Sequence, residues 1–345
     1  MATRRKRPAW VTKAATRDRS AVTRYAVGVV TGSIVAGPWV RLAGERHLRD
    51  LLDAKKRGLV FDRQRAEHLL GFFPRFLRLA EGQFDGQPFA LQGWQAFILG
   101  SVFGWVTTGG ARRFRTAYIE VGKGAGKSPM AAGVGLYGLL LDDEPSAEVY
   151  SAATTREQAR ILFQDARKMI AASPELSPTV RMGQNNIATT RGFSFFRPVS
   201  SEHRGLDGKR VHVSLIDELH EHPTDLVVEK MRAGMKGRRQ PLQFEITNAG
   251  HDRTSVCWRH HEYSTRLLEG AVDNDEWFAY VAALDEDDDP FEDRSCWVKA
   301  NPNIGVSIPE SYLAGQVREA VGMAAKEAIV RRLNFCQWTK TITRA

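Results

Sequence analysis

The chain has 345 residues, 43% of them hydrophobic and 26% charged, which is enough to bury one large core or two smaller ones. It contains no apolar run of about 18 residues, and its charged amino-terminal segment lacks the apolar core of a secretory signal, so neither a membrane span nor secretion is indicated. The cysteines are only three and widely spaced, at Cys257, Cys296 and Cys336, which excludes a disulfide framework and favours a reducing cytoplasm.

The net charge of +9 is unevenly distributed along the chain. Residues 1–24 hold eight basic side chains against a single acid, Asp18, so the remainder carries only about +2. We expect residues 1–40 to form a basic, flexible arm. Such an arm could lie along nucleic-acid phosphates, or it could be solvated and without a partner, and the sequence leaves both interpretations open.

From residue 41 onward the spacing of apolar residues predicts a folded body. Helical periodicity covers 41–80, and a further apolar helix opens near residue 89 and continues to about 103. Strands are expected at 117–121, 148–153, 211–216 and 242–247, with helices at 130–141, 155–171 and 225–235 and a hairpin at 187–196. Strands that alternate with helices predict a mainly parallel sheet covered by helices, that is, an α/β fold.

The pattern changes beyond residue 255. An acidic loop at 285–289 is followed by one long predicted helix over 310–333. We therefore expect a core domain over 41–255 and a smaller lid or linker subdomain over 256–345.

The strongest chemical signal is the segment 122–128, which reads Gly-Lys-Gly-Ala-Gly-Lys-Ser directly after a predicted strand. Glycines let consecutive backbone N–H groups turn toward phosphate oxygens, and the amino terminus of the next helix adds partial positive charge. In such a P-loop (Walker A motif), Lys127 reaches the terminal phosphates of ATP and the Ser128 hydroxyl binds Mg²⁺. The expected nucleotide-binding residues of the loop are Gly122, Lys123, Gly124, Ala125, Gly126, Lys127 and Ser128.

This loop departs from the usual P-loop pattern. Val121 occupies the place where the first glycine is expected, so that glycine is shifted to Gly122. A second cation, Lys123, lies inside the loop.

An ATPase also needs a carboxylate for Mg²⁺ and a base for the attacking water. The apolar run 211–216 ends in Asp217 and Glu218, which supply both. Asp217 is placed for the metal ion and Glu218 for polarising water. The following predicted strand ends at Thr247 and Asn248, and either side chain could sense the γ-phosphate or its water.

Taken together, these motifs resemble the ATPase part of the large terminase subunit of tailed bacteriophages. The resemblance covers about 65–340 and includes Phe-Ala-Leu-Gln-Gly-Trp-Gln at 89–95, Leu-Asp-Gly at 206–208 and Trp-Val-Lys-Ala-Asn-Pro-Asn at 297–303. It implies a P-loop NTPase fold of the additional-strand, catalytic-glutamate type with a small lid subdomain. It also implies that Gln95, with Trp94 nearby, recognises adenine. Lys123 is similar to the extra basic residue of the terminase loop, and Asn248 falls in the motif that couples hydrolysis to movement.

The resemblance implies a motor that hydrolyses ATP and drives double-stranded DNA into a procapsid. The implied setting is a homo-oligomeric ring, a pentamer on the procapsid, with the portal protein and the small terminase subunit as partners in the host cytoplasm. A ring can complete each site with an arginine from a neighbour. Arg204 is the candidate, with Arg156 and Arg160 as alternatives.

Large terminases usually continue into a nuclease domain with a cluster of metal-binding acids. This chain ends soon after the predicted lid helix, so we expect no nuclease domain and assign no DNA cutting. Two other functions stay open: a superfamily-2-type helicase or other DNA-remodelling ATPase, and a non-catalytic ATP-gated assembly module. The adjacent acids Asp217 and Glu218 argue against the second, and the short mixed segment after residue 255 argues against the first.

Overall fold

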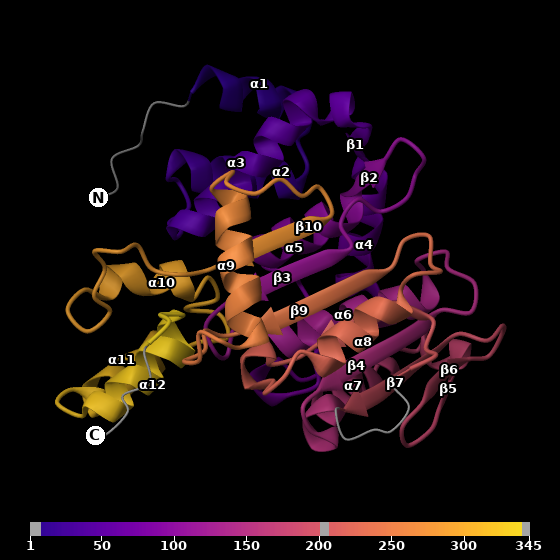
Figure 1. Cartoon of the computed structure of the whole chain (residues 1–345). Coiled ribbons are helices and arrows are strands. Elements are labelled where there is room, and N and C mark those ends of the chain that lie inside the picture. Colours follow the sequence, from indigo (N-terminus) through magenta and orange to yellow (C-terminus); the bar gives the residue numbers. More distant parts are fainter. Residues whose placement is uncertain (1–7, 201–206, 340–345) are drawn as a thin grey trace.

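The computed structural model describes residues 8–200 and 207–339. Within them, an eight-stranded, mostly parallel sheet has helices on both faces (Figure 1). A two-stranded sheet pairs β1 (Leu59–Phe61) with β2 (Trp105–Thr107) beside it. The α/β class predicted from the sequence is confirmed. None of the described helices is long and apolar enough to cross a membrane.

The order of strands in the main sheet identifies the type of α/β fold. Across the sheet it runs β10 (Trp277–Val281), β3 (Thr116–Glu120), β9 (Leu242–Thr247), β8 (Val211–Ile216), β4 (Glu148–Ala153), β7 (Phe195–Ser200), β6 (Ile187–Thr189) and β5 (Val180–Met182). The first six are parallel, whereas β6 and β5 are antiparallel additions at one edge. Because β9 separates β3 from β8, the sheet has the additional strand that the family resemblance implied.

The crossover helices divide between the two faces of the sheet. The connections β3–α6–β4 and β4–α7–β7 run in one direction across the sheet, with α6 (Lys127–Leu140) and α7 (Arg156–Ala171). Those through α8 (Leu226–Gly234) and α9 (Val256–Leu268) run in the opposite direction. Since such crossovers are right-handed, the two pairs of helices cover opposite faces, as Figure 1 shows.

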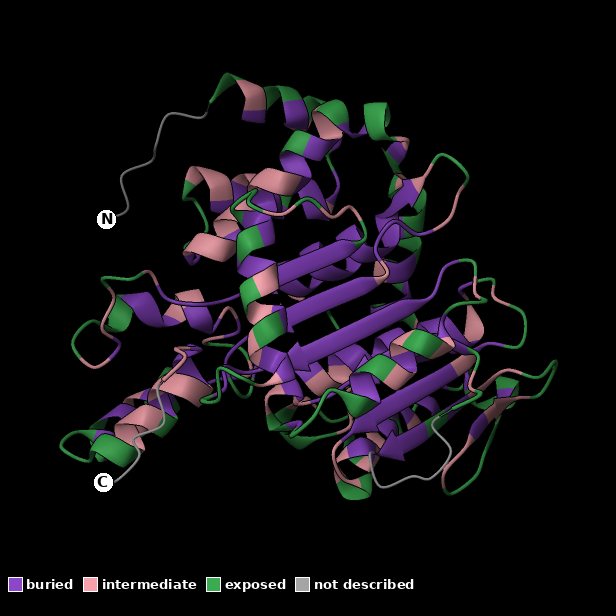
Figure 2. Ribbon diagram, viewed as in Figure 1, coloured by how far each residue is buried: buried purple, intermediate pink, exposed green. Residues whose placement is uncertain are grey.

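The centre of the sheet is buried on both sides (Figure 2). The sequence does not show this burial as continuous apolar runs: β8 and β9 alternate apolar with polar residues, and the polar Gln243 and Glu245 of β9 are fully buried. Helix α6 packs closely on the sheet because it carries glycines: a Cβ on Gly138 would lie 2.6 Å from Val213 Cγ2, and one on Gly135 would lie 2.8 Å from Leu215 Cδ1. Substitution at either glycine would push the P-loop helix off the sheet.

The amino-terminal region forms α1 (Ala9–Arg17), α2 (Ala21–Thr31), α3 (Pro38–Asp53), α4 (Arg63–Phe76) and α5 (Gly93–Gly104). Helices α3 to α5 agree with the helical spacing predicted over 41–80 and 89–103, whereas α1 and α2 were not expected. The expected flexible arm over 1–40 is therefore wrong for residues 8–40, while residues 1–7 lie outside the described part. Val11 and Ala14 are fully buried, so an apolar face beneath the basic residues fixes α1 to the fold.

The carboxyl-terminal region also differs from the expected domain division. Strand β10 belongs to the main sheet, so residue 255 does not mark its boundary. Beyond it, α10 (Trp297–Ala300), α11 (Glu310–Ala320) and α12 (Ala324–Phe335) form a small helical unit near the carboxyl ends of the strands (Figure 1). The single helix predicted over 310–333 is interrupted at Gly322, whose φ of 79° is left-handed. Short 3₁₀ helices occur at Ala54–Arg57, Gly82–Phe84, Ser177–Thr179, Leu219–Glu221 and Arg294–Cys296.

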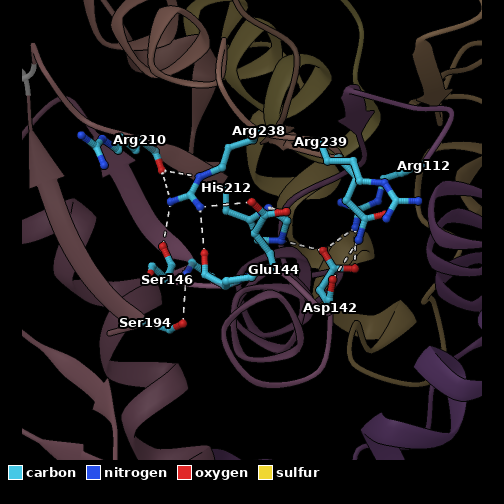
Figure 3. A network of polar contacts seen from close by, with 12 residues as sticks. Arg112, Asp142, Glu144, Ser146, Ser194, Arg210, His212, Arg238 and Arg239 are labelled. Atoms are coloured by element: carbon cyan, nitrogen blue, oxygen red, sulfur yellow. Dashed lines mark hydrogen bonds and ion pairs between the residues drawn. The ribbon is translucent and has the colours of Figure 1, made fainter. Parts of the chain in front are cut away.

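A network of charged side chains lies at the amino ends of the parallel strands, on the side of the sheet opposite the carboxyl ends (Figure 3). Asp142 accepts a hydrogen bond of 2.6 Å from Arg112 Nη2 and lies 2.7 Å from His212 Nε2. Arg238 Nη1 donates to Glu144 Oε1 at 3.1 Å. Burial opposes the charge of Asp142, but Arg112 and His212 outweigh it and lower the pKa of that carboxyl below its usual value. This network joins the starts of neighbouring strands.

Candidate nucleotide-binding site

The predicted P-loop lies between the carboxyl end of β3 and the first turn of α6. Gly124 and Gly126 have φ values of 87° and 80°, which are left-handed and suit glycine. Lys127 is buried, and its Nζ donates to the carbonyl oxygens of Val121 at 2.7 Å and Gly122 at 3.3 Å. The loop therefore wraps around its own lysine.

Lys127 also joins the loop to the neighbouring strand β9. Its Nζ donates a hydrogen bond to Asn248 Oδ1, and Asn248 is 1% exposed. Burial lowers the pKa of the ammonium group, and the nearby Glu218 carboxylate acts in the opposite direction. Lys127 and Asn248, 121 residues apart in the chain, are thus in contact at the predicted site.

Asp217 follows β8 and lies beside the start of α6. Burial, together with the charge of Glu218, raises the pKa of Asp217 to about 7, against the opposing effects of Lys127 and of a hydrogen bond with the Ser128 side chain. The two predicted Mg²⁺ ligands, Asp217 and Ser128, therefore lie near each other. A hard carboxylate oxygen and a hydroxyl are donors that suit Mg²⁺.

Glu218 has an unusual backbone conformation. Its φ of 46° and ψ of 54° are left-handed, which is uncommon for a residue with a side chain and typically costs about 1–3 kcal/mol. The carboxylate oxygen Oε2 is buried and lies 3.2 Å from His220 Nδ1, but the angles do not make a hydrogen bond. Glu218 is therefore held in a strained position with part of its acceptor capacity unused.

His220 is a residue of this region to which the sequence analysis assigned no role. Its backbone N–H and its Nδ1 lie 3.0 Å and 3.1 Å from Thr247 Oγ1, so the end of β8 is fastened to the end of β9. Burial lowers the pKa of His220 to about 4, despite the neighbouring Glu221. A neutral His220 positions the turn that carries Glu218. A histidine three residues after Asp217 was the only sequence signal for it.

A cavity of about 420 Å³ opens beside the P-loop. Its walls include Gln95, Gly126, Met169 and Asn303. Gln95 Oε1 accepts the backbone N–H of Gln92 at 2.9 Å and so caps α5, and its Nε2 lies near Gly126. Gln95 therefore lines the cavity, and its recognition of adenine stays a prediction.

Trp94 lies differently from Gln95. It is 2% exposed and packs in the core against Tyr280, and its indole Nε1 donates to Asn303 Oδ1 at 3.0 Å. Trp94 does not line the cavity, so its contribution to the site is through Asn303 rather than through a base.

The predicted cations divide into those that the structure describes and one that it does not. The Lys123 side chain is exposed, and Arg156 is exposed at the first position of α7. Arg160 donates to Asn185 Oδ1 at 2.7 Å. Arg204, the preferred candidate for an arginine finger, lies outside the described residues. The choice among the three arginines therefore stays a prediction.

The carboxyl-terminal unit supplies contacts to the P-loop that the sequence analysis did not predict. Ala300 and Leu333 accept hydrogen bonds from loop N–H groups, and Asn303 and Ser307 donate to loop carbonyls. The segment 297–303 was part of the family resemblance, but nothing in its composition indicates a contact with residues 122–125.

Comparisons with known proteins identify the family of this chain. A family model described as the ATPase domain of the terminase large subunit matches residues 93–266, just over half of the chain. The chain belongs to the terminase large subunit family. This confirms the resemblance drawn from residues 122–128, 217–218 and 246–250.

The relatives place this terminase chain among longer proteins. The large terminase subunit of Enterobacteria phage HK97 is 25% identical over 291 residues, which cover 81% of this chain and 54% of that protein. The crystal structure of the HK97 large terminase matches with a TM-score of 0.69 and 22% identity, over 79% of this chain and 55% of that one. Protein YmfN of Escherichia coli (strain K12) is 37% identical over 132 residues, which cover 38% of this chain and 29% of that protein. This chain therefore spans about half the length of the HK97 protein.

A second family model, the endonuclease domain of the terminase large subunit, matches residues 271–344. This corrects the expectation that the chain holds no part of a nuclease domain: the segment that includes β10 and the carboxyl-terminal helices is similar to one. Within residues 8–200 and 207–339, no group of three or more His, Cys, Asp or Glu side chains is arranged to hold a metal ion.

Proposed function

We propose that this terminase chain binds ATP with Mg²⁺ and hydrolyses it to drive double-stranded DNA into a procapsid. The observation that carries the proposal is the convergence of three motifs on Lys127. The loop carbonyls, Asn248 and Asp217 follow the ends of β3, β9 and β8, which are adjacent strands, and Ser128 lies in the first turn of α6. Ligands of open parallel sheets bind at this edge.

Each residue then has a chemical role. The inward N–H groups of the loop and Lys127 bind the phosphates of ATP, and Ser128 and Asp217 hold Mg²⁺. When bound, Mg²⁺ neutralises charge on the phosphate oxygens. Binding of Mg²⁺ favours the ionised form of Asp217, whose pKa of about 7 already allows ionisation at neutral pH.

Glu218 is the base or orienting group for the attacking water. Its carboxylate has unused acceptor capacity, and the left-handed backbone turns it away from the continuing strand direction. Asn248 senses the γ-phosphate or its water and couples hydrolysis to movement, a role that its hydrogen bond with Lys127 supports. Lys123 and an arginine of a neighbouring copy, with Arg204 as first candidate, stabilise the developing charge.

The proposal includes an assembly. The chain acts in the host cytoplasm as a homo-oligomeric ring, a pentamer on the procapsid, together with the portal protein and the small terminase subunit. The ring is the reason for an arginine acting between copies, and the family membership supports these partners.

The test is phosphate release by the 345-residue chain with and without linear double-stranded DNA. We expect DNA to stimulate turnover, and Glu218→Gln to lower kcat by about 10²–10⁴-fold while Mg·ADP still binds. Glu229→Gln, an exposed glutamate on α8, is the matched control and should stay within about twofold, as is usual for surface positions. Wild-type turnover that DNA does not stimulate would contradict the motor, and near-normal turnover of Glu218→Gln would contradict the base assignment.

A further inference from the structure

The peptide groups of the P-loop point in two opposite directions. At Val121 and Gly122 the carbonyl oxygens face inward to Lys127 Nζ. The N–H groups of Gly122 and Lys123 therefore face outward, because the C=O and N–H of a trans peptide point in opposite directions. There they donate to Ala300 O at 3.0 Å and Leu333 O at 2.8 Å, both in the carboxyl-terminal unit.

The peptide groups Gly124–Ala125 and Ala125–Gly126 are reversed. The carbonyl of Gly124 faces outward and accepts from Ser307 Oγ at 2.8 Å, and that of Ala125 accepts from Asn303 Nδ2 at 3.0 Å. By the same planarity, the N–H groups of Ala125 and Gly126 face inward. No described residue accepts a hydrogen bond from either of these N–H groups, so both are available to an anion.

Asn303 is the centre of this arrangement. It is 4% exposed, and each end of its amide is used: Oδ1 accepts from Trp94 Nε1 at 3.0 Å, while Nδ2 donates to Ala125 O and, at 2.9 Å, to Ser307 Oγ. The Asn303 amide therefore links helix α5, which carries Trp94, to the P-loop and to the carboxyl-terminal unit. It also forms part of the wall of the 420 Å³ cavity.

We propose that Asn303 is a positioning residue that sets the phosphate-binding form of the P-loop by holding the Ala125 carbonyl outward. Ser307 does the same for Gly124. If the amide donor is lost, the peptide between Ala125 and Gly126 can rotate, since Gly126 tolerates a wide range of φ. A rotated peptide presents a carbonyl oxygen, rather than an N–H group, to the phosphates.

The inference rests on the proposed nucleotide function, and it adds a role for the segment that the endonuclease-domain model matches. Residues 300, 303, 307 and 333 all lie within 271–344. The geometry of the ATP site thus depends on a segment that is similar to the endonuclease domain of terminases.

The experiment is calorimetric titration of Mg·ADP into the full chain and its variants. Asn303→Asp keeps the size of the side chain and the acceptor for Trp94 but removes the donor, and Asn303→Ala separates the loss of the donor from the added charge. We expect both to weaken ADP binding by about 10- to 100-fold, the usual effect of a lost buried hydrogen bond on a fixed group. Asn274→Asp, which makes the same change at the opposite edge of the sheet, should bind like wild type.

Ser307→Ala is the second variant, because Ser307 is only partly buried and its loss leaves the fold intact. It should weaken ADP binding by about 3- to 10-fold. In ATP turnover, Ser307→Ala and Asn303→Ala should raise KM while kcat at saturating ATP stays within about threefold, a split that general loss of stability does not produce. The melting temperature without nucleotide identifies any variant that fails to fold. If the Asn303 variants do not fold, ADP binding by Ser307→Ala tests the positioning role.

The outcomes separate the two proposals. Weaker binding by the Asn303 and Ser307 variants, with normal binding by Asn274→Asp, supports the positioning role. Equal ADP binding by wild type, Asn303→Asp and Ser307→Ala overturns the positioning role and leaves the ATPase standing. If the wild-type chain does not bind Mg·ADP, the nucleotide function fails, and the positioning role fails with it.

Discussion

Two buried aspartates at opposite edges of the sheet have opposite pKa shifts. Asp142, where the strands begin, is 8% exposed, and its pKa is lowered because Arg112 and His212 outweigh burial. Asp217, where the strands end, is 6% exposed, and its pKa is raised to about 7 because burial is reinforced by Glu218. Since their burial is alike, the difference lies in the neighbouring charges.

The two aspartates illustrate a structural role, for Asp142, and a proposed role in ligand binding, for Asp217. At the beginning of the strands, the charged groups compensate each other within the chain (Figure 3). At the end of the strands, Asp217 and Glu218 are adjacent acids, and the compensating charge is incomplete. Two adjacent, incompletely compensated acids are unfavourable for the protein alone and become favourable when a cation binds.

The largest effect is expected from Asp142→Asn, which leaves Arg112 as a buried charge with no counterion. Loss of one partner of a buried pair costs about 3–5 kcal/mol. We therefore expect the free energy of unfolding, measured with urea at pH 7.5, to fall by about that amount, while Mg·ADP affinity of the folded protein is unchanged.

Asp143→Asn is the control for this change. Asp143 is exposed, and its φ of 52° is tolerated by asparagine, so its stability should change by less than about 0.5 kcal/mol. An Asp142→Asn protein as stable as the control would show that this network does not stabilise the fold.

A smaller effect of opposite sign is expected from Asp217→Asn. In the wild type, the raised folded-state pKa gives stability that is complete below the unfolded value near 3.8 and is lost as pH rises through about 7. Asparagine carries no charge at any of these pH values. The variant should therefore exceed the wild type by about 2–4 kcal/mol at pH 8, and the difference should shrink steadily toward pH 4.

Urea unfolding at pH 8, 6 and 4.5 measures this difference directly, without nucleotide or Mg²⁺. A stability difference that is constant from pH 8 to 4.5 would mean that folded Asp217 is ionised over this whole range. Asp217 would then lack a raised pKa and would resemble Asp142. Loss of Mg²⁺-dependent ADP binding in the same variant is expected, because Asp217 is a proposed ligand.

The sequence predicted the central part of the molecule more accurately than its ends. Strands such as 148–153 and 211–216 are short segments of mainly apolar residues bounded by loops, so their limits follow from local pattern. Strand β10 was missed even though Trp277–Val281 is an apolar run that follows β9 and α9 in the strand–helix–strand order of the core. Helices α1 and α2 were missed because the many basic residues of 1–24 drew attention away from a buried face that includes Val11 and Val22.

The candidate site shows the same limit. The sequence places Lys127, Asp217 and Glu218 in recognisable motifs directly after predicted strands. Because the carboxyl ends of parallel strands lie on one side of the sheet, the proximity of these residues could be predicted. Asn303 could not be predicted in the same way. It lies 178 residues after Ala125, and their contact exists only because β10 returns the chain to β3.

The smallest effect is expected from Gln95→Glu, which tests whether the carboxyl-end edge also recognises the base. The substitution keeps an acceptor for the N–H of Gln92, so the capping of α5 and the stability should be retained. It removes the amide donor beside Gly126, which is the group that the resemblance assigns to adenine. The preference for ATP over GTP in competition binding should therefore fall by about 3- to 10-fold. Since the cap is unchanged, a loss of preference without a loss of stability would assign the amide donor to the base. An unchanged preference would restrict Gln95 to capping α5, and its edge of the sheet would then bind only phosphate and metal.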